Sequence, residues 1–180
     1  MRVINLISGP GRGKSTTASG LFYKMKINGL NVELVNEYAK DMTWENRQNI
    51  LKDQLYIFAK QNRKLERLRN KVDYVITDSP LILGLAYTHE EYPKSFEPFV
   101  IDIWNTYNNI NFYLSNKGDL TYQEIGRNQD KFEAEKINKN ILDFVHKKSI
   151  DYKTVMVQAG NEDMSSNHIN FLYEEIINAS

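Results

Sequence analysis

The sequence predicts an α/β fold in which a parallel sheet of five strands lies between helices. Five short runs rich in Val, Ile, Leu and Tyr alternate along the 180-residue chain with longer segments whose apolar residues recur at helical spacing. Strands that alternate with helices favour a parallel sheet covered on both faces. Ligands of such sheets bind at the carboxyl ends of the strands. The expected strands are residues 3–7, 30–35, 72–77, 110–114 and 152–157.

The segments between these runs are predicted to be helices, and the whole chain, residues 1–180, is expected to form one domain. Residues 43–70 are expected to form one long helix that Thr43 caps, with room for a break between residues 42 and 48. In the helix over 129–148, the expected buried side is Phe132, Ile137, Ile141, Phe144 and Val145. The other expected helices are 16–27, 96–107 and a last helix that contains Ile169 and Ile176.

Residues 8–15, Ser-Gly-Pro-Gly-Arg-Gly-Lys-Ser, stand between the first strand and the first helix. Glycines let a backbone turn tightly and aim its N–H groups at an anion, and the following helix adds further N–H groups. This is the pattern of a phosphate-binding loop, or P-loop, with Ser8 in place of the first glycine. Lys14 would reach the β- and γ-phosphates of ATP, and the Ser15 hydroxyl would ligate Mg²⁺. The expected nucleotide-binding residues are Gly9, Gly11, Arg12, Gly13, Lys14, Ser15 and Thr16, of which Arg12 has the alternative of facing solvent.

Two carboxylates follow predicted strands at the same edge of the sheet. Asp78 would lie beside Ser15, where it would hold Mg²⁺ through water or accept a proton from the attacking hydroxyl; the structural alternative is a helix N-cap. Glu37 would bind or deprotonate an acceptor hydroxyl, or else form a surface ion pair with Lys40. Lys14, Asp78 and Glu37 are therefore predicted to be catalytic, and the sequence leaves open which carboxylate is the base.

Residues 115–128 are polar and contain two glycines, which predicts a flap before the last strand. Within it, Arg127 would swing over the transferring phosphoryl group and neutralise developing charge, unless it is an ordinary solvated arginine. The turn at 158–160 follows the fifth strand, where a purine ring would lie against the backbone, and Gly160 is the expected contact.

Composition and charge limit the partners. The formal net charge is zero, which argues against a protein that coats nucleic acid by charge alone. Residues 60–71 are nevertheless basic and would clamp an acceptor phosphate or a nucleic-acid backbone, or else form a solvated face. Cysteine is absent, the three histidines are far apart, and no run is long enough to span a membrane. We therefore expect no thiolate metal site, no membrane partner and a cytoplasmic protein.

Four stretches carry a resemblance to known kinases: Gly-Pro-Gly-Arg-Gly-Lys-Ser-Thr-Thr, Val-Asn-Glu-Tyr-Ala-Lys, Val-Ile-Thr-Asp-Ser-Pro-Leu and Gly-Arg-Asn-Gln. With them the chain resembles, over most of its length, the P-loop kinases of nucleosides and nucleotides. More narrowly, it is similar to a group of bacteriophage P-loop kinases, and through them to the phage kinases that phosphorylate the hydroxymethyl group of 5-hydroxymethyluracil in DNA.

The resemblance implies a nucleotide-kinase-like three-layer sandwich with a flap before the last strand, and a phosphotransferase that uses ATP and Mg²⁺. It implies roles for Lys14, Ser15 and Asp78, and it extends to Glu37 and Arg127. The expected acceptor is hydroxymethylated pyrimidine in DNA. Two alternatives stay open, a kinase for a free nucleoside or nucleoside monophosphate, and a P-loop ATPase or nucleotide-dependent binding module. The single flap arginine argues against nucleoside monophosphates, whose kinases tend to have several.

Overall fold

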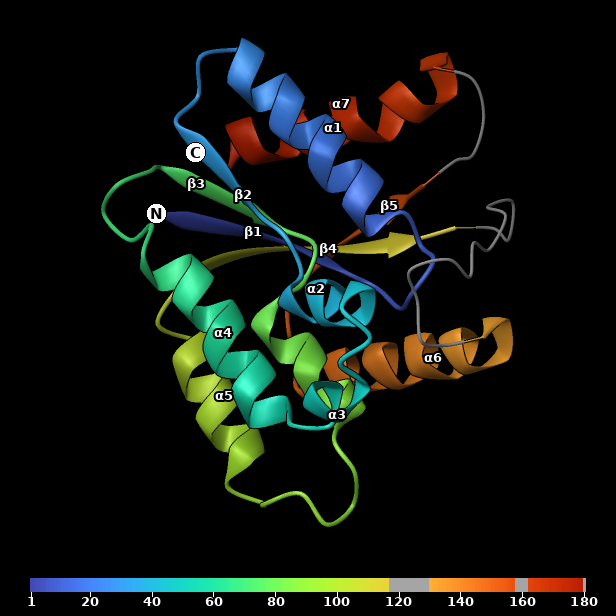
Figure 1. The fold of residues 1–180 in the computed structure, drawn as a ribbon. Coiled ribbons are helices and arrows are strands. Elements are labelled where there is room, and N and C mark those ends of the chain that lie inside the picture. The colour runs from blue at the N-terminus through green and yellow to red at the C-terminus, as the bar shows by residue number, and fades with distance from the viewer. Residues whose placement is uncertain (117–129, 158–161, 180) are drawn as a thin grey trace.

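A parallel sheet of five strands runs through the middle of the protein, as a computed structural model of the chain shows (Figure 1). The structure describes residues 1–116, 130–157 and 162–179. The strand order is β2-β3-β1-β4-β5 and every neighbouring pair is parallel, which confirms the predicted fold class. The central strand pairs Ile4 with Ile76 on one side and with Ile110 on the other. The strands are β1 (Arg2–Ile7), β2 (Val32–Val35), β3 (Tyr74–Thr77), β4 (Asn108–Ser115) and β5 (Lys153–Met156).

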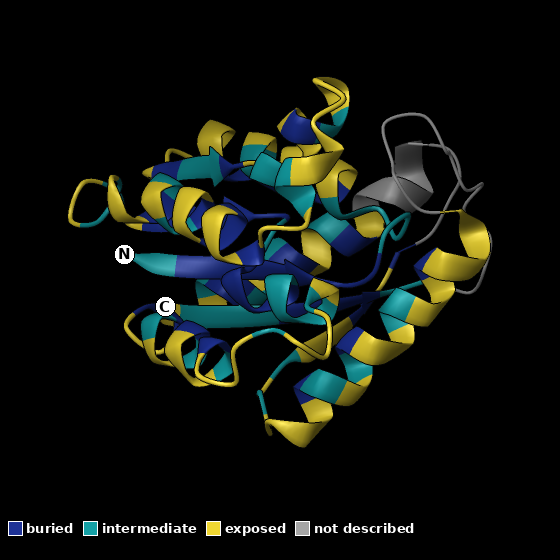
Figure 2. Ribbon diagram, turned by 60° about the horizontal axis from the view of Figure 1, so that its bottom comes forward, coloured by how far each residue is buried: buried dark blue, intermediate teal, exposed yellow. Residues whose placement is uncertain are grey.

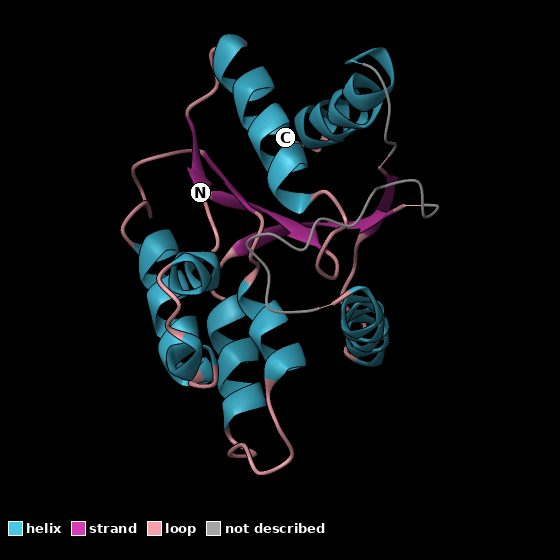
Figure 3. Cartoon of the chain, turned by 45° about the vertical axis from the view of Figure 1, so that its right-hand side comes forward, coloured by secondary structure: helices cyan, strands magenta, loops and turns pink. Residues whose placement is uncertain are grey.

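Helices cover both faces of this sheet (Figure 3). They are α1 (Lys14–Ile27), α2 (Tyr38–Trp44), α3 (Gln48–Leu51), α4 (Gln54–Glu66), the 3₁₀-helix η1 (Leu81–Tyr87), α5 (Phe96–Trp104), α6 (Lys131–Lys147) and α7 (Glu162–Asn178). α1 and α7 lie on one face, and α4, α5 and α6 lie on the other. Because side chains alternate along a strand, β1 sends Ile4 and Leu6 to the α1 face and Val3 and Ile7 to the opposite face.

The predicted helix over 43–70 is not continuous, because three helices occupy the segment from α2 to α4. The first interruption lies between residues 42 and 48, where the sequence left room for a break, and the second, between α3 and α4, was not predicted. Asn46 has a left-handed backbone, with φ of 55°, and ends α2. The Arg47 N–H then donates to the Met42 carbonyl at 2.9 Å, which is the bond pattern of a Schellman C-cap. Thr43 lies inside α2 rather than at its start, and its hydroxyl donates to the Ala39 carbonyl one turn earlier at 3.2 Å. The N-cap of α4 is Asp53, whose carboxylate accepts from the Tyr56 N–H at 3.0 Å.

The helices bury one side and expose the other (Figure 2). In α6 the buried residues are Ala134, Ile141 and Val145, whereas Phe132 is 79% exposed, against the expectation that it would be buried. Two residues turn a helix by about 200°, so Phe132 points away from the face that carries Ala134. Among the described residues no helix is both long and apolar enough to cross a membrane.

Candidate active site

The phosphate-binding loop joins the carboxyl end of β1 to the start of α1. Gly11 and Gly13 have φ of 78° and 84°, a left-handed conformation that side chains with a Cβ rarely adopt. Gly13 is the N-cap of α1, and the first bond within the helix runs from the Thr17 N–H to the Gly13 carbonyl at 2.9 Å. The N–H groups that precede Thr17 therefore point out of the end of the helix, where an anion can accept from them.

Lys14 is held at the centre of this loop. Its Nζ donates to the carbonyl oxygens of Ser8 and Gly9, at 2.9 and 2.8 Å. Both carbonyls belong to the loop itself, so the ammonium group lies where the loop wraps round it. This arrangement keeps a positive charge beside the outward-pointing N–H groups of α1.

Ser15 and Asp78 meet across the end of the sheet. The Ser15 hydroxyl donates to Oδ2 of Asp78 at 2.6 Å, and the Glu37 backbone N–H donates to Oδ1 at 3.1 Å. Asp78 is 4% exposed. These two hydrogen bonds, from the start of α1 and from the residue before α2, hold its buried carboxylate in place. It does not cap η1, whose N-cap is Pro80.

The oxygens of Ser15 and Asp78 fit a magnesium ion, because Mg²⁺ prefers hard oxygen ligands. Within the described residues, no group of three or more His, Asp or Glu side chains is placed to hold a metal. Mg²⁺ usually keeps several waters and takes one or two protein ligands together with phosphate oxygens. A hydroxyl and a carboxylate at the phosphate loop match that donor set.

Glu37 follows β2 at the N-cap position of α2, and its side chain lines the same cavity as Lys14. Burial raises the pKa of Glu37 above its ordinary value, Lys14 opposes this rise, and Asp78 adds to it. Among the described residues its carboxylate forms no ion pair with Lys40 or with any other cation. The carboxylate is therefore placed to accept a proton from a molecule in the cavity.

A cavity of about 320 Å³ extends from the phosphate loop to a second wall formed by α2, α3, α4 and η1. Its loop end carries Lys14, Ser15, Asp78 and Glu37. Its far end is largely apolar and is lined by Leu51, Ile57, Phe58, Leu81 and Leu83, with the buried carboxamides of Gln54 and Gln61 among them. One cavity thus joins the phosphate loop to a pocket lined by apolar side chains and two carboxamides.

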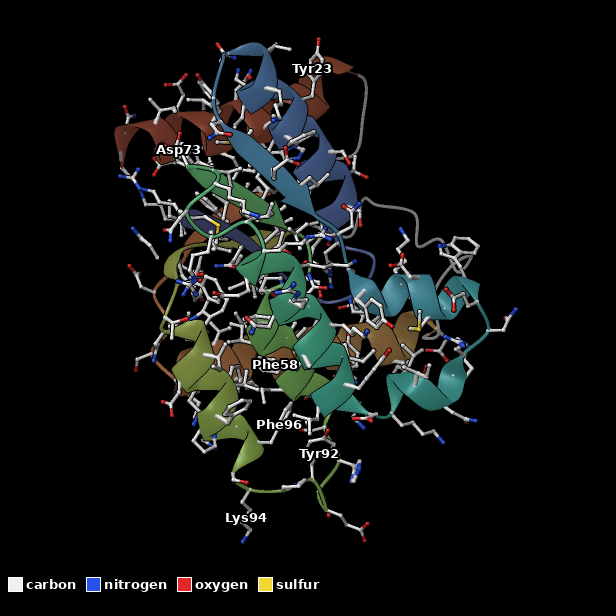
Figure 4. All side chains as sticks on the ribbon, turned by 60° about the vertical axis from the view of Figure 1, so that its left-hand side comes forward. Tyr23, Phe58, Asp73, Tyr92, Lys94 and Phe96 are labelled. Atoms are coloured by element: carbon white, nitrogen blue, oxygen red, sulfur yellow. The ribbon has the colours of Figure 1, made fainter. Side chains whose placement is uncertain are left out.

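Phe58 is held by aromatic side chains behind it (Figure 4). Its ring centroid lies 6.0 Å from that of Phe96, which in turn lies 4.9 Å from that of Tyr92. The Tyr92 hydroxyl accepts from the Leu55 N–H at 2.6 Å and so ties the loop before α5 to the first turn of α4. These contacts fix the apolar end of the cavity.

The two carboxamides of α4, those of Gln54 and Gln61, differ in their hydrogen bonds to the described residues. Gln61 accepts from the Tyr38 N–H at 3.0 Å and donates to the Thr77 hydroxyl at 3.4 Å, so it joins α2 to β3. Gln54 donates to the Leu51 carbonyl at 2.7 Å, while its Oε1 takes no bond from the described residues. The sequence interpretation missed both. The signal was Gln54 and Gln61 at helical spacing around an apolar stripe, since a glutamine on a buried face needs a partner.

The structure divides the other predicted site residues into three groups. Gly11, Gly13 and Thr16 line the cavity together with Lys14 and Ser15. Gly9 and Arg12 are turned away from it and contact α6, as described below. Arg127, Gly160 and all but the first two residues of the predicted flap lie outside the described residues.

The basic segment over 60–71 is not one helical face. α4 ends at Glu66, so Arg67 and Lys71 lie beyond it. Arg69 pairs with Glu66 at 2.9 Å and packs over the Tyr107 ring, while Lys64 donates to the Asn36 carbonyl at 3.0 Å. Several of these cations are therefore occupied by contacts within the protein.

A family model described as an AAA domain matches residues 3–163. The chain belongs to this family. No curated protein is significantly similar to the chain in sequence. Membership of the AAA domain family agrees with the phosphate loop at its start and covers every described site residue.

Solved structures with a similar fold include nucleoside and nucleotide kinases. Deoxyadenosine kinase from M. mycoides, with the products dCMP and dCDP bound, has a TM-score of 0.64 at 17% identity, and the match covers 99% of this chain and 100% of that one. Thymidylate kinase from Ehrlichia chaffeensis has a TM-score of 0.62 at 19% identity, over 99% and 97% of the two chains. The deoxyadenosine kinase with dATP bound gives 0.59 at 18% identity, over 98% and 100%. The nucleotide-kinase-like fold is confirmed, whereas the narrower kinship with phage 5-hydroxymethyluracil kinases finds no match among these proteins.

Proposed function

We propose that the protein is an ATP-dependent kinase that transfers the γ-phosphate either to a hydroxyl of a free nucleoside or to the phosphate group of a free nucleoside monophosphate. The observation that supports this most strongly is the cavity that joins the phosphate loop to an apolar pocket, where the amide oxygen of Gln54 takes no hydrogen bond from the described residues. An ATPase needs room for water beside the γ-phosphate. A pocket lined by Phe58, Leu83 and Gln54 suits an organic acceptor, because its lining is mainly apolar with one polar group.

In this proposal the loop N–H groups and Lys14 hold the β- and γ-phosphates of ATP and neutralise charge that develops during in-line transfer. Ser15 and Asp78 would hold Mg²⁺, which when bound neutralises charge on the phosphates. Asp78 already accepts two hydrogen bonds, so Glu37 is the better candidate for the base that orients and deprotonates the acceptor hydroxyl. Arg127 and Gly160 keep their proposed roles at the phosphoryl group and the purine.

The acceptor end suits a flat, partly polar ring such as a nucleobase. Phe58 offers an apolar surface for such a ring. The Oε1 atom of Gln54 would accept a hydrogen bond from an amino or imino group of the ring. The solved structures of the same fold are enzymes named for deoxyadenosine and thymidylate, and they make the free small molecule a better supported acceptor than the DNA base that the sequence favoured.

The test is an acceptor screen with γ-labelled ATP and Mg²⁺. Purine and pyrimidine nucleosides, their monophosphates, duplex DNA containing 5-hydroxymethyluracil and ordinary thymine DNA are offered separately, with Lys14→Ala as the inactive control. We expect label on a free nucleoside or monophosphate. Release of phosphate into water that no acceptor diverts would replace the kinase with an ATPase or a nucleotide-dependent binding module.

A DNA acceptor is the second candidate, and one surface favours it. Trp44 on α2 and Tyr56 on α4 are exposed on the helices that wall the cavity, and Lys60 Nζ lies 5.2 Å from the centre of the Tyr56 ring. Exposed aromatic rings interleaved with cations can stack and hold a single strand. The pair Lys60→Glu and Arg63→Glu should then weaken transfer to hydroxymethyluracil DNA in a salt-dependent way while sparing ATP binding.

A further inference from the structure

Helix α6 packs directly against the phosphate loop. The Gly9 N–H donates to Oδ1 of Asn138 at 2.8 Å, and the Tyr113 hydroxyl donates to the same oxygen at 3.2 Å. A Cβ built on Gly9 would lie 2.6 Å from Cβ and 2.9 Å from Cα of Asn138. Gly9 has no left-handed backbone to explain it, so its missing side chain is what admits the helix at this distance.

A second contact joins the loop to the same helix. The Arg12 guanidinium pairs with the Glu135 carboxylate, one turn before Asn138, and also donates to the side chain of Asn116 at the end of β4. The Arg12 side chain is only 14% exposed. The Glu135 side chain is 57% exposed, so solvent screens the pair on that side, and the main effect of the pair is to fix the orientation of the Arg12 guanidinium.

Gly9 connects α6 to Lys14. Its N–H is bonded to Asn138, and its carbonyl accepts from Lys14 Nζ at 2.8 Å. The peptide group before Gly9 is thus held by helix α6, and the peptide group after Gly9 is held by Lys14, the residue that would bind ATP. A change at Asn138 shifts the carbonyl that places the ammonium group, without removing any group that touches the nucleotide.

We propose that Asn138 and Glu135 of α6 are positioning residues for ATP, acting through Gly9 and Arg12. In this assignment, which rests on the proposed function, Arg12 does not bind phosphate, because its guanidinium group pairs with Glu135. Helix α6 then sets the shape of the loop before nucleotide arrives. Preorganisation of this kind improves binding because the loop need not be ordered at the moment of association.

The first test compares Asn138→Ala with Asn140→Ala, an exposed asparagine on the same helix. Binding of ATP with Mg²⁺ is measured by calorimetry, together with KM for ATP, KM for the acceptor and the melting temperature. Asn138→Ala should weaken ATP binding by roughly three- to tenfold, the worth of one hydrogen bond, while KM for the acceptor stays the same. Equal ATP binding by the two variants would overturn the role of Asn138.

The second test is a double-mutant cycle of Arg12→Ala and Glu135→Ala on ATP affinity. If Arg12 acts through Glu135, each single change weakens binding by a similar factor and the double change adds little. Glu135→Ala removes a negative charge near a polyphosphate site, so simple electrostatics would make ATP bind more tightly. If Arg12→Ala binds ATP weakly while Glu135→Ala binds it normally or more tightly, Arg12 contacts the phosphates directly and the assignment is wrong. Failure of the unchanged protein to bind ATP would instead remove the proposed function.

Discussion

The Ser15 hydroxyl donates a 2.6 Å hydrogen bond to the buried carboxylate of Asp78, across 63 positions of sequence. This bond links the first turn of α1 to the end of β3. The other oxygen of the same carboxylate accepts from the backbone of Glu37. Three segments are therefore held at one edge of the sheet, and each supplies one of the groups proposed for phosphoryl transfer.

Lys14→Ala should lower the rate of phosphoryl transfer by about 10²–10³ and leave the fold intact. Lys14 bonds to two carbonyl groups of its own loop, and the side chain supplies the positive charge proposed for the γ-phosphate. Loss of one preorganised donor of this kind costs about 10²–10³ in rate. The checks are initial rates of labelled transfer and the melting temperature; full activity in this variant would remove the loop from the mechanism.

Asp78→Asn should raise the Mg²⁺ concentration needed for half-maximal activity. An amide keeps one accepting oxygen but loses the charge, and its NH₂ group would face a donor. The buried mismatch should also lower the free energy of unfolding by about 1–3 kcal/mol. A magnesium titration of activity measures the first effect and urea unfolding the second. Asp73→Asn, before β3 rather than after it, is the matched control, and an unaltered magnesium requirement in Asp78→Asn would contradict the metal role.

Glu37→Gln should lower kcat/KM by about 10²–10⁴, the usual contribution of a general base. The pKa of Glu37 is raised by burial, so kcat/KM of the unchanged protein should fall as pH drops through an apparent pKa above the usual glutamate value. The variant should lack this acid limb. Glu33→Gln on β2, whose carboxylate pairs with Lys26 at 3.3 Å, serves as the control. A variant that keeps the same pH profile would exclude Glu37 as the base.

Gly84→Ala should raise KM for the acceptor and leave KM for ATP unchanged. A Cβ at Gly84 would lie 3.3 Å from Oε1 of Gln54, close enough to force the amide to shift by a few tenths of an ångström. Because the shift disturbs one hydrogen bond to the acceptor, the expected rise is roughly three- to tenfold. Gly20→Ala, within α1 where it faces Ile169 of α7, should affect stability only. An equal rise in both KM values would mean that the pocket does not hold the acceptor.

His168 should make the protein less stable as pH falls below about 6.5, the ordinary histidine pKa. It lies buried on α7 with Nε2 3.1 Å from the Thr17 hydroxyl, and burial lowers its pKa. At higher pH both folded and unfolded states carry neutral histidine. At lower pH the histidine of the unfolded chain becomes protonated first, because the pKa of His168 in the folded protein is lower. The unfolding free energy measured against pH should show this loss, and His168→Gln should flatten it.

Much of the fold was predictable because its signals are local. Five apolar runs alternating with helical segments are sufficient to indicate a parallel sheet, and all five strands are present. The helix over 43–70 was predicted in part. The break that the sequence allowed between residues 42 and 48 lies at the left-handed Asn46, whereas the second break, at the Asp53 N-cap of α4, is not reported by an apolar period. The prediction that Phe132 is buried was also wrong. Phe132 lies about half a helical turn from the buried Ala134, so its side chain points to solvent.

The sequence by itself determined the phosphate loop and the two carboxylates that end β2 and β3. Glycine conformation, a lysine before a helix and the alternation of strands are properties of neighbouring residues. Only the tertiary structure decided that Gly9 and Arg12 face α6 and that Gln54 and Phe58 line the same cavity as the phosphate loop. Gly9 and Asn138 are 129 positions apart. Whether such residues touch depends on how whole layers pack, and no local pattern records it.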